Sequence, residues 1–254
     1  MRIISYNING IRAGIKKGLI QWLEQERPDV ICFQEIKANV NQFETSLFEN
    51  LGYNCYWYSA QKKGYSGVAI LSKKVPKQVI YGCGNEKIDS EGRILKIDFD
   101  NISVMSCYFP SGTTGDERQG FKIDFINFFY SFIKSQKNNL VICGDFNICH
   151  KSIDIHNPIA NKKSSGFLPE ERDWITAFLK LGFIDTFRHI NKKPDYYSWW
   201  SYRANSRANN KGWRIDYNML SENLKSAIKY AKIMKEAYHS DHCPILLDLD
   251  ESVI

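Results

Sequence analysis

Polar side chains that could do chemistry stand at the ends of the apolar, strand-like runs of this 254-residue chain. Carboxylates and amides predominate among them, together with one phenol and one imidazole. Hard cations such as Mg²⁺ prefer oxygen-rich sites of this kind, in which one or two carboxylates act with water and substrate phosphate. If the strand ends meet at one edge, the sequence predicts a hydrolytic site around a hard metal. The candidates are Asn7, Glu35, Tyr108, Asp145, Asn147, Asp216, Asp241 and His242.

Other chemistries compete for the adjacent pair Asp241 and His242, which precedes the final apolar run. The pair could be a capping and packing detail, a zinc site, half of a nucleophile triad, or part of the hard-metal site. Zinc is disfavoured because the spacing of Cys143, Cys149 and His150 matches no common zinc pattern. A serine hydrolase is disfavoured because the chain has no G-x-S-x-G elbow, and phosphate-binding glycine motifs are also missing.

Strand-like and helix-like segments alternate along the chain and must position these residues. Alternation in 139–147 would point Asp145 and Asn147 the same way, and alternation in 92–100 favours a sheet with one covered face. The polar and aromatic stretch 195–211 is typical of a surface loop. With no linker or repeat, we predict one domain over 1–254, an α/β sandwich of mixed sheets with helices outside. Strands are expected at 2–7, 29–35, 66–72, 92–100, 101–110, 139–147, 213–221 and 243–249, and helices at 17–26, 115–136 and 168–183.

Composition indicates a globular protein with a mildly basic surface. Hydrophobic residues make up 43% and charged residues 24%, and the formal net charge is +6. That charge is compatible with a polyanionic partner but does not by itself indicate nucleic acid. Seven scattered cysteines without a CxxC pair, and no secretory signal, predict a reduced, cytoplasmic location. The apolar runs are too short to span a bilayer, so no membrane association is expected.

Six segments resemble, in order and spacing, the exonuclease III-like apurinic/apyrimidinic endonucleases of the endonuclease/exonuclease/phosphatase superfamily. The likeness covers about Arg2 to Leu249, and its segments are SYNINGIR, FQEIK, CYFPSG, CGDFNICHKSIDIHNP, GWRIDYNMLS and HSDHCPILL. The resemblance implies a four-layer α/β sandwich, with two packed, mostly antiparallel sheets flanked by helices. It also implies a monomeric, Mg²⁺-dependent enzyme, in which Mn²⁺ can substitute. The implied substrates are double-stranded DNA with abasic sites, nicked on the 5′ side, and damaged or ordinary 3′ ends.

The resemblance also assigns roles to the candidate residues. Glu35 is similar to the metal-binding carboxylate of the family, assisted by Asn7 and Asp241. Asp145 and Asn147 resemble the pair that positions and activates the attacking water, and they belong with His242 to the implied metal neighbourhood. Asp145 is also a candidate to protonate the leaving oxygen.

On the phosphate side, Tyr108 resembles the phenol that contacts the scissile phosphate. His242, paired with Asp216, resembles the imidazole that stabilises the phosphate oxygens. An aspartate partner would make the imidazole more basic, so a cationic His242 is expected near neutral pH.

Two positions depart from the family pattern. Asn9 stands where many relatives have an acid, which makes a second tightly bound metal less expected. Ser111 stands where relatives often carry a larger amide, which could change phosphate contact or the balance between endonuclease and exonuclease activity.

The loop YYSWWSYRANSRANNKGWR interleaves aromatic and basic residues, as expected for a surface that holds phosphates and unstacked nucleotides. By resemblance, Trp199, Trp213 and Ile215 are the apolar walls of a pocket for the abasic sugar, and Arg203 lies in a loop that wedges into the duplex. Core packing is the alternative for the tryptophans, most of all for Trp200. The remaining basic residues of the loop, expected to contact phosphates, are Arg207, Lys211 and Arg214.

Three further basic residues, Lys37, Arg118 and Lys122, are expected on a solvated charged face, with phosphate contact as the alternative. Two rival functions stay open. One is another enzyme of the superfamily, either a general deoxyribonuclease or a phosphoesterase for lipid or inositol head groups. The other is a catalytically inactive DNA-binding scaffold.

Overall fold

The first of two sheets is built from both ends of the chain. The computed structural model describes residues 1–136 and 139–254. In this sheet β1 runs parallel to β2 and antiparallel to β12, so the two ends of the chain pair at its centre. Its strand order is β11 (Ile228–Ile233), β12 (Ile245–Leu249), β1 (Arg2–Asn7), β2 (Val30–Gln34), β4 (Val68–Ser72), β3 (Asn54–Tyr58).

The second sheet also has six strands and lies against the first. Its only parallel pair is β7 with β8, and the other neighbours are antiparallel. Its strand order is β5 (Gln78–Tyr81), β6 (Ile94–Asp98), β7 (Ser103–Tyr108), β8 (Leu140–Asp145), β10 (Asp216–Ser221), β9 (Phe183–Asp185). Six-stranded mixed sheets of this kind confirm the predicted fold class.

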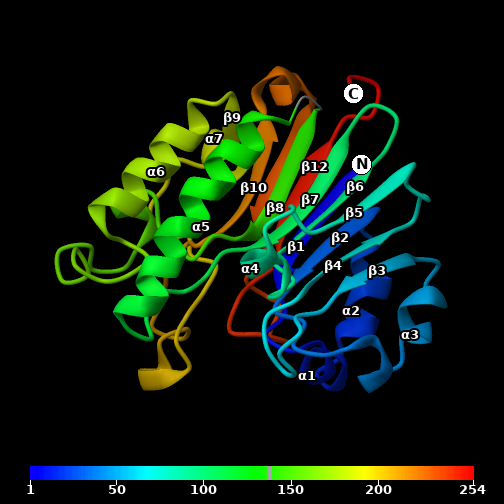
Figure 1. The fold of residues 1–254 in the computed structure, drawn as a ribbon, viewed down its shortest axis with the longest axis horizontal. Coiled ribbons are helices and arrows are strands. Elements are labelled where there is room, and N and C mark those ends of the chain that lie inside the picture. The colour runs from blue at the N-terminus through cyan, green and yellow to red at the C-terminus, as the bar shows by residue number, and fades with distance from the viewer. Residues whose placement is uncertain (137–138) are drawn as a thin grey trace.

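Helices cover the outer faces of both sheets (Figure 1). Near the first sheet lie α1 (Ile11–Lys16), α2 (Leu19–Glu26) and α3 (Ser46–Glu49), and near the second lie α5 (Asp116–Lys134) and α6 (Pro169–Leu179). Two short helices, α4 (Glu86–Asp89) and α7 (Thr186–Ile190), and 3₁₀ turns at Val40–Gln42, Ser152–Asp154, Arg203–Asn205 and Glu222–Ala227 complete the described elements.

Three separate layers of apolar side chains hold the four structural layers together. Between the sheets, Ile3 and Val30 pack with Leu95 and Val141. A second layer joins the outer face of the first sheet to α1, α2 and α3, and a third joins the second sheet to α5 and α6. The third layer uses the stripe predicted for residues 115–136, because Phe125, Phe129 and Ile133 are buried there.

One prediction about the sheets is wrong. Strand β6 was expected to have one covered face, but side chains on both of its faces are buried. Leu95 and Ile97 point to the layer between the sheets, whereas Ile94 joins the layer under the helices. Lys96 is also buried, with its ammonium bonded to Gln136 and paired with Asp98. A polar residue within the alternation was therefore no sign of a solvated face.

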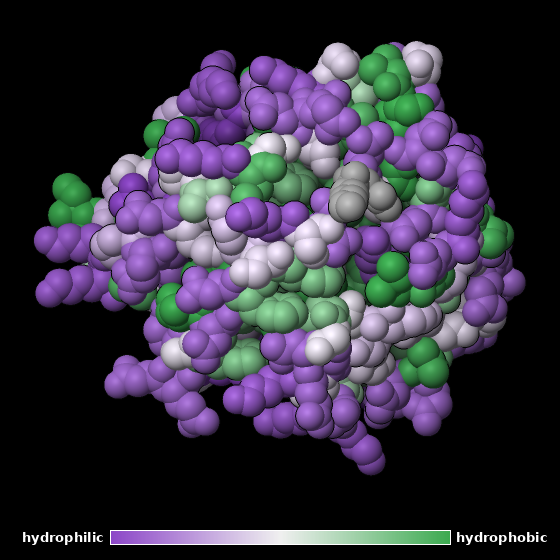
Figure 2. Space-filling model, turned by 45° about the horizontal axis from the view of Figure 1, so that its top comes forward, coloured by the Kyte–Doolittle hydropathy of each residue, from purple (hydrophilic) through white to green (hydrophobic). Residues whose placement is uncertain are grey.

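Hydrophilic side chains make up most of the face seen in Figure 2, with apolar side chains exposed in patches between them. Within residues 1–136 and 139–254, no helix has the length and apolar character needed to cross a bilayer. All seven cysteines are free thiols.

Candidate active site

Strand register brings three of the polar residues into one row at the end of the second sheet. Tyr108 on β7 is the Cα partner of Asp145 on β8, and Asp145 is in turn the partner of Asp216 on β10. In the first sheet, Asn7 ends β1, and Glu35 directly follows the neighbouring parallel strand β2. Asn7 donates hydrogen bonds to Glu35 and to Asp145, both at 2.9 Å, and so joins the ends of the two sheets. The predicted convergence is therefore present.

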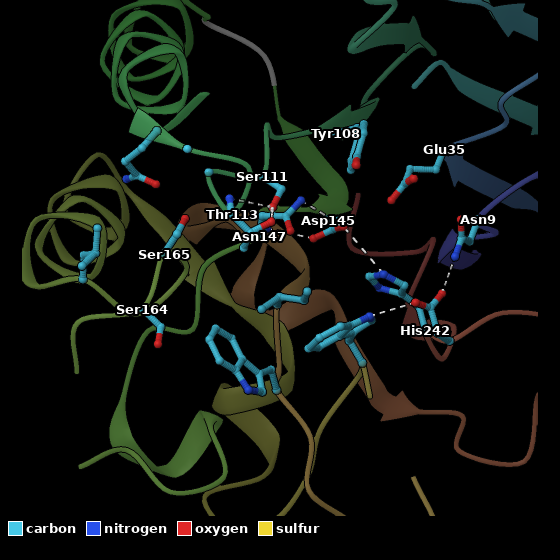
Figure 3. A pocket seen from close by; sticks show the side chains of 18 of the residues that line it. Asn9, Glu35, Tyr108, Ser111, Thr113, Asp145, Asn147, Ser164, Ser165 and His242 are labelled. Carbon is cyan, nitrogen blue, oxygen red and sulfur yellow. Dashed lines mark hydrogen bonds and ion pairs between the residues drawn. The ribbon is translucent and has the colours of Figure 1, made fainter. Parts of the chain in front are cut away.

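A pocket of about 910 Å³ opens at these strand ends (Figure 3). Asn7 and Asp216 lie behind the wall and contact residues that line it. Arg203 is exposed and is not part of the wall. The predicted residues that do line the pocket are Glu35, Tyr108, Asp145, Asn147, Trp199, Trp213, Ile215, Asp241 and His242.

The Glu35 and Asp145 carboxylates lie close enough together to hold a metal ion, with the His242 imidazole beside them. Glu35, Asp145 and His242 each offer one ligand atom, and these atoms lie within 4.8 Å of one another. Within the described residues this is the one such grouping of His, Cys, Asp and Glu. Two carboxylates beside an open pocket fit a hard divalent cation that keeps waters and takes a substrate oxygen. Asn7 turns its amide nitrogen toward the carboxylates, so this orientation holds Glu35 and Asp145 rather than adding a ligand.

The surroundings of Cys149 and His150 do not support a zinc site. The Cys149 thiol donates to the Asp154 carbonyl oxygen, and His150 Nε2 meets the Thr176 hydroxyl at 2.8 Å. Each is therefore satisfied separately.

Asp145 and Asn147 lie together for a different reason from the one predicted. Strand β8 ends at Asp145, and Asn147 has a φ of 52°, in the left-handed region. The chain turns back, so that the Asn147 backbone N–H donates to Asp145 Oδ1 at 2.8 Å. The Asn147 side-chain nitrogen donates to the Phe109 carbonyl at 3.0 Å. A turn, and not strand alternation, therefore aims both side chains at the pocket.

The His242 imidazole is held by Asp216. Nδ1 lies 3.0 Å from Asp216 Oδ2, and Nε2 lies 3.9 Å from Asp145 Oδ2. Burial acts to lower the pKa of His242, but the negative charges of Asp216, Asp145 and Asp241 together outweigh it and raise the pKa to about 10, so the ring is cationic at neutral pH. Ser198, which sequence reasoning missed, donates to Asp216 Oδ2 at 2.6 Å. Nothing in the sequence distinguished this serine from others in the loop.

The carboxylates differ in their surroundings. Burial, followed by the charge of Asp216, raises the pKa of Asp145 to about 8. Burial also acts to raise the pKa of Glu35, but Lys37 and Asn7 more than offset it and hold the pKa below its ordinary value. Lys37 Nζ lies 2.6 Å from Glu35 Oε2. Two carboxylates with separated pKa values suit different tasks, because one stays ionised while the other can exchange a proton.

The Asp241 carboxylate is held by two donors. Asn9 Nδ2 donates to Asp241 Oδ1 at 2.8 Å, and Trp199 Nε1 donates to Oδ2 at 3.0 Å. Asn9 Oδ1 in turn accepts from Lys37 at 2.6 Å. An amide at position 9 can both accept from the lysine and donate to the aspartate, which a carboxylate could not do. The departure at Asn9 therefore fits its neighbours.

Tyr108 is oriented by a second residue that sequence reasoning missed. The buried Arg93 donates to the Tyr108 carbonyl at 2.6 Å, and its guanidinium carbon lies 4.7 Å from the centre of the Tyr108 ring. Burial, and then the Glu35 carboxylate, raise the pKa of Tyr108 well above its ordinary value. The phenol therefore stays protonated and can donate a hydrogen bond into the pocket. In the sequence, Arg93 is a single arginine before an apolar strand, and nothing around it distinguishes it from other arginines.

Several basic residues expected at the surface have structural roles instead. Arg214 is fully buried and pairs with Asp154 and Asp185, both at 2.7 Å, so it is not exposed for phosphate contact. Arg207 donates to backbone carbonyls within residues 235–240. Both corrections have one physical cause, since a guanidinium can satisfy several buried acceptors at once.

The predicted charged face is also corrected at Lys122, which is fully buried rather than solvated. Arg118 is partly buried and bonds to Glu91. Lys37 pairs with Glu35 and also lines the pocket, as do Asn9 and Ser111. Trp200 is buried in a small apolar cluster, as the core alternative stated.

This chain is similar to known proteins in both sequence and fold. The model of the Endonuclease/Exonuclease/phosphatase family matches residues 4–242. The chain belongs to this family. An exodeoxyribonuclease of Bacillus subtilis is 44% identical over 253 residues, covering 97% of this chain and 98% of the relative. The DNA repair nuclease APEX1 of Danio rerio is 39% identical, covering 98% of this chain and 82% of the relative.

Solved structures of the family have the same fold. An AP endonuclease from Archaeoglobus fulgidus superposes with a TM-score of 0.90 at 29% identity, covering 98% of this chain and 99% of the other. A 3′ phosphatase from Neisseria bound to product DNA hairpin gives a TM-score of 0.91 at 26% identity, with the same coverage. The resemblance stated from six sequence segments is therefore confirmed, and the chain is a hydrolase of the exodeoxyribonuclease and AP endonuclease type.

Proposed function

We propose that this family member is a Mg²⁺-dependent DNA repair nuclease that hydrolyses the phosphodiester 5′ to abasic sites. Removal of nucleotides and blocking groups from 3′ ends is proposed as a companion activity. The observation that carries the proposal is the pocket itself, which is lined by Glu35, Asp145 and His242 together with the indoles of Trp199 and Trp213. One end of the pocket suits a phosphate and the other suits a base-less sugar.

Glu35 and Asp145 would hold the divalent cation, with His242 beside them. When bound, Mg²⁺ supplies charge that stabilises the phosphoryl and leaving oxygens of the hydrolysed diester. Asn7 orients both carboxylates from behind, because its amide donates to each of them. We propose that Asp241 acts on this region through Asn9 and Lys37, to which it is linked by hydrogen bonds. Mn²⁺ is proposed to substitute, since oxygen ligands also suit it.

Asp145 and Asn147 are proposed to position and deprotonate the attacking water. The turn between them leaves Asn147 Oδ1 without a bond to the main chain while its nitrogen is held by Phe109. A carboxyl whose pKa lies near neutrality can take a proton from water and return one to the leaving oxygen. Asp145 is the residue whose surroundings supply that property.

His242 and Tyr108 are proposed to stabilise the phosphate. The imidazolium held by Asp216 presents a positive charge, and the protonated phenol presents a hydrogen-bond donor. Donors fixed in a mostly buried site stabilise developing charge without reorganising. The indoles of Trp199 and Trp213, with Ile215, would form the walls around the sugar, and the exposed Arg203 would contact a phosphate beyond the pocket.

A gel assay with three labelled substrates tests this function. Abasic duplex, intact duplex and a soluble phosphoester are incubated with and without Mg²⁺. Incision 5′ to the abasic site should exceed reaction with either alternative. Preference for intact duplex would favour a general deoxyribonuclease, and preference for the soluble ester would favour another phosphoesterase.

The Asp145→Asn variant separates an enzyme from an inactive scaffold. It should retain binding to abasic DNA and lose nearly all cleavage, because the amide cannot exchange the proton. Unchanged cleavage would remove Asp145 from the mechanism. We also propose that residues 1–254 act as one domain, since β1 and β12 pair within one sheet. The monomeric state and cytoplasmic location stay predictions.

A further inference from the structure

A fully buried ion pair joins the two helices that cover the second sheet. Lys122 on α5 and Glu171 on α6 have no exposed side-chain surface, and Lys122 Nζ lies 2.7 Å from Glu171 Oε1. Burying two charges carries a desolvation cost that a packed apolar pair would avoid. Both side chains also form hydrogen bonds to the backbone around the pocket.

The lysine reaches beyond its partner to the catalytic turn. Lys122 Nζ donates to the Asn147 backbone carbonyl at 2.8 Å. This carbonyl belongs to a residue with a φ of 52°, a left-handed conformation that is uncommon outside glycine although asparagine adopts it more readily than most residues. The Asn147 N–H is held by Asp145 and its side chain by Phe109, so Lys122 fixes the third point of attachment.

The glutamate holds a second wall of the same pocket. Glu171 Oε2 accepts from the backbone N–H groups of Gly166 and Leu168, at 2.6 and 3.1 Å. Segment 164–168 lines the pocket through Ser164, Ser165 and Leu168, opposite Glu35 and Tyr108 (Figure 3). The Gly166 carbonyl also accepts from the Cys149 N–H at 2.7 Å, which ties this segment to the catalytic turn.

We propose that Lys122 and Glu171 are positioning residues that lock the Asn147 turn and segment 164–168 in one arrangement for catalysis. Neither lines the pocket, so neither is expected to touch DNA. This inference rests on the proposed function, because its catalytic readout requires cleavage of abasic DNA. A purely structural pair would change stability but not the turnover of folded enzyme.

Lys122→Met tests the lock, because methionine keeps an unbranched apolar stem and removes the ammonium. Ile133→Ala is the matched control. Ile133 is buried on the same helix, but it lies near the C-terminal end of α5, far from the Asn147 turn. Both variants should lower Tm. At a temperature where all proteins are folded, Lys122→Met should lower kcat by about 10- to 100-fold with the Kd for abasic DNA changed less than about threefold. Ile133→Ala should leave kcat within about twofold of wild type.

Hydrogen exchange gives a readout that does not depend on catalysis. Amides in 145–150 and 164–168 should exchange faster in Lys122→Met than in wild type, and these two segments should not respond to Ile133→Ala. If Lys122→Met does not fold, Lys122→Gln replaces it in both measurements, because the shorter amide cannot span Glu171 and Asn147 together.

The two proposals fail in distinguishable ways. Equal kcat in the lysine variant and wild type, with unchanged exchange in both segments, would overturn the lock. Wild type that binds but does not cleave abasic DNA would overturn the proposed function, while the exchange data would still decide whether the pair holds the two walls.

Discussion

Asp145 and Asp216 are direct cross-strand neighbours on β8 and β10, and the His242 imidazole contacts both. Two acids facing each other in an antiparallel pair repel when both are ionised. The imidazolium between them offsets that repulsion, and their burial strengthens every charge effect among the three groups. The register of one strand pair therefore contributes, together with burial, both to the charge of the histidine and to the proton affinity of Asp145.

Replacing Asp216 should lower the basicity of His242. In Asp216→Asn the largest cause that raises the pKa is removed, while Asp145 and Asp241 remain, so the pKa should fall from about 10 toward its ordinary 6.5. The ring would then lose its proton as pH rises through this lower value. NMR titration of the imidazole in metal-free protein measures the shift, and kcat at pH 7.5 should fall about 100-fold or more. A titration unchanged from wild type would contradict the pairing.

Ser198→Ala should impair the same pair indirectly. Ser198 donates to Asp216 and also accepts from the backbone N–H groups of Ile215 and Asp216, so its loss leaves buried polar groups without partners. We expect a loss of about 1–3 kcal/mol in unfolding free energy and a reduced kcat. Urea unfolding and steady-state cleavage measure both. Ser252→Ala, at an exposed position, is the control and should change neither.

Arg203→Ala should weaken DNA binding through phosphate contact. One lost contact should reduce the slope of log K against log salt by about 1. Lys77→Ala removes the same charge at the far end of the strands, where Lys77 pairs with Asp100, and should leave the slope unchanged. Fluorescence anisotropy at several salt concentrations makes the comparison. Equal slopes for Arg203→Ala and wild type would place Arg203 outside the DNA contact.

Metal removal should stop turnover and Glu35 should determine how much metal is needed. EDTA-treated enzyme should be inactive and regain activity with Mg²⁺. Glu35→Gln should need at least tenfold more Mg²⁺ for half-maximal cleavage, because one ionised ligand has been removed. Calorimetric titration with Mg²⁺ measures the affinity directly. An EDTA-resistant wild type would exclude the hard-cation site.

The buried acid Asp154 should make the fold sensitive to strong acid. Burial acts to raise its pKa, but Arg214 and Arg188 outweigh it and lower the pKa from 3.8 to about 2. A lowered pKa contributes stability that is complete above about pH 4 and is lost as pH falls through about 2. The contribution is about 2 kcal/mol. Urea unfolding from pH 7 to pH 2 should show the gap between wild type and Asp154→Asn narrowing in that window.

The exposed Asp100→Asn serves as control for the acid series. Its unfolding curve should stay parallel to that of wild type throughout. A constant gap between wild type and Asp154→Asn below pH 4 would contradict the assignment of the acid-sensitive contribution to Asp154.

Much of the fold and site followed from local patterns. Apolar runs that end in polar residues predicted the strand ends, and the register of β7, β8 and β10 shows why these ends meet. The prediction that Asp145 and Asn147 share a direction was correct in outcome and wrong in cause. Strand alternation gave the expectation, whereas a turn with a left-handed asparagine produces it. A sequence does not show where a strand stops when its last residues are polar.

The errors concern side chains whose partners lie far away in the sequence. Arg214 looked like a phosphate contact because arginine interleaved with aromatics has the same appearance in a DNA loop and in a buried network. Its partner Asp154 is 60 positions away, and that pairing exists only in the fold. For the same reason Lys122 was wrongly expected on a solvated face, and Arg93 and Ser198 were missed. Periodicity reports burial of apolar faces, but buried polar networks are specified by three-dimensional contacts.

The pairing of β1 with β12 also determines when the first sheet can be completed during synthesis of the chain. Asn7 and His242 are more than 200 positions apart, so the ribosome makes the histidine long after the asparagine. A nascent or truncated chain that stops before this histidine therefore lacks both strand β12, which pairs with β1, and the imidazole of the site. The complete site is therefore assembled only after His242 has been synthesised.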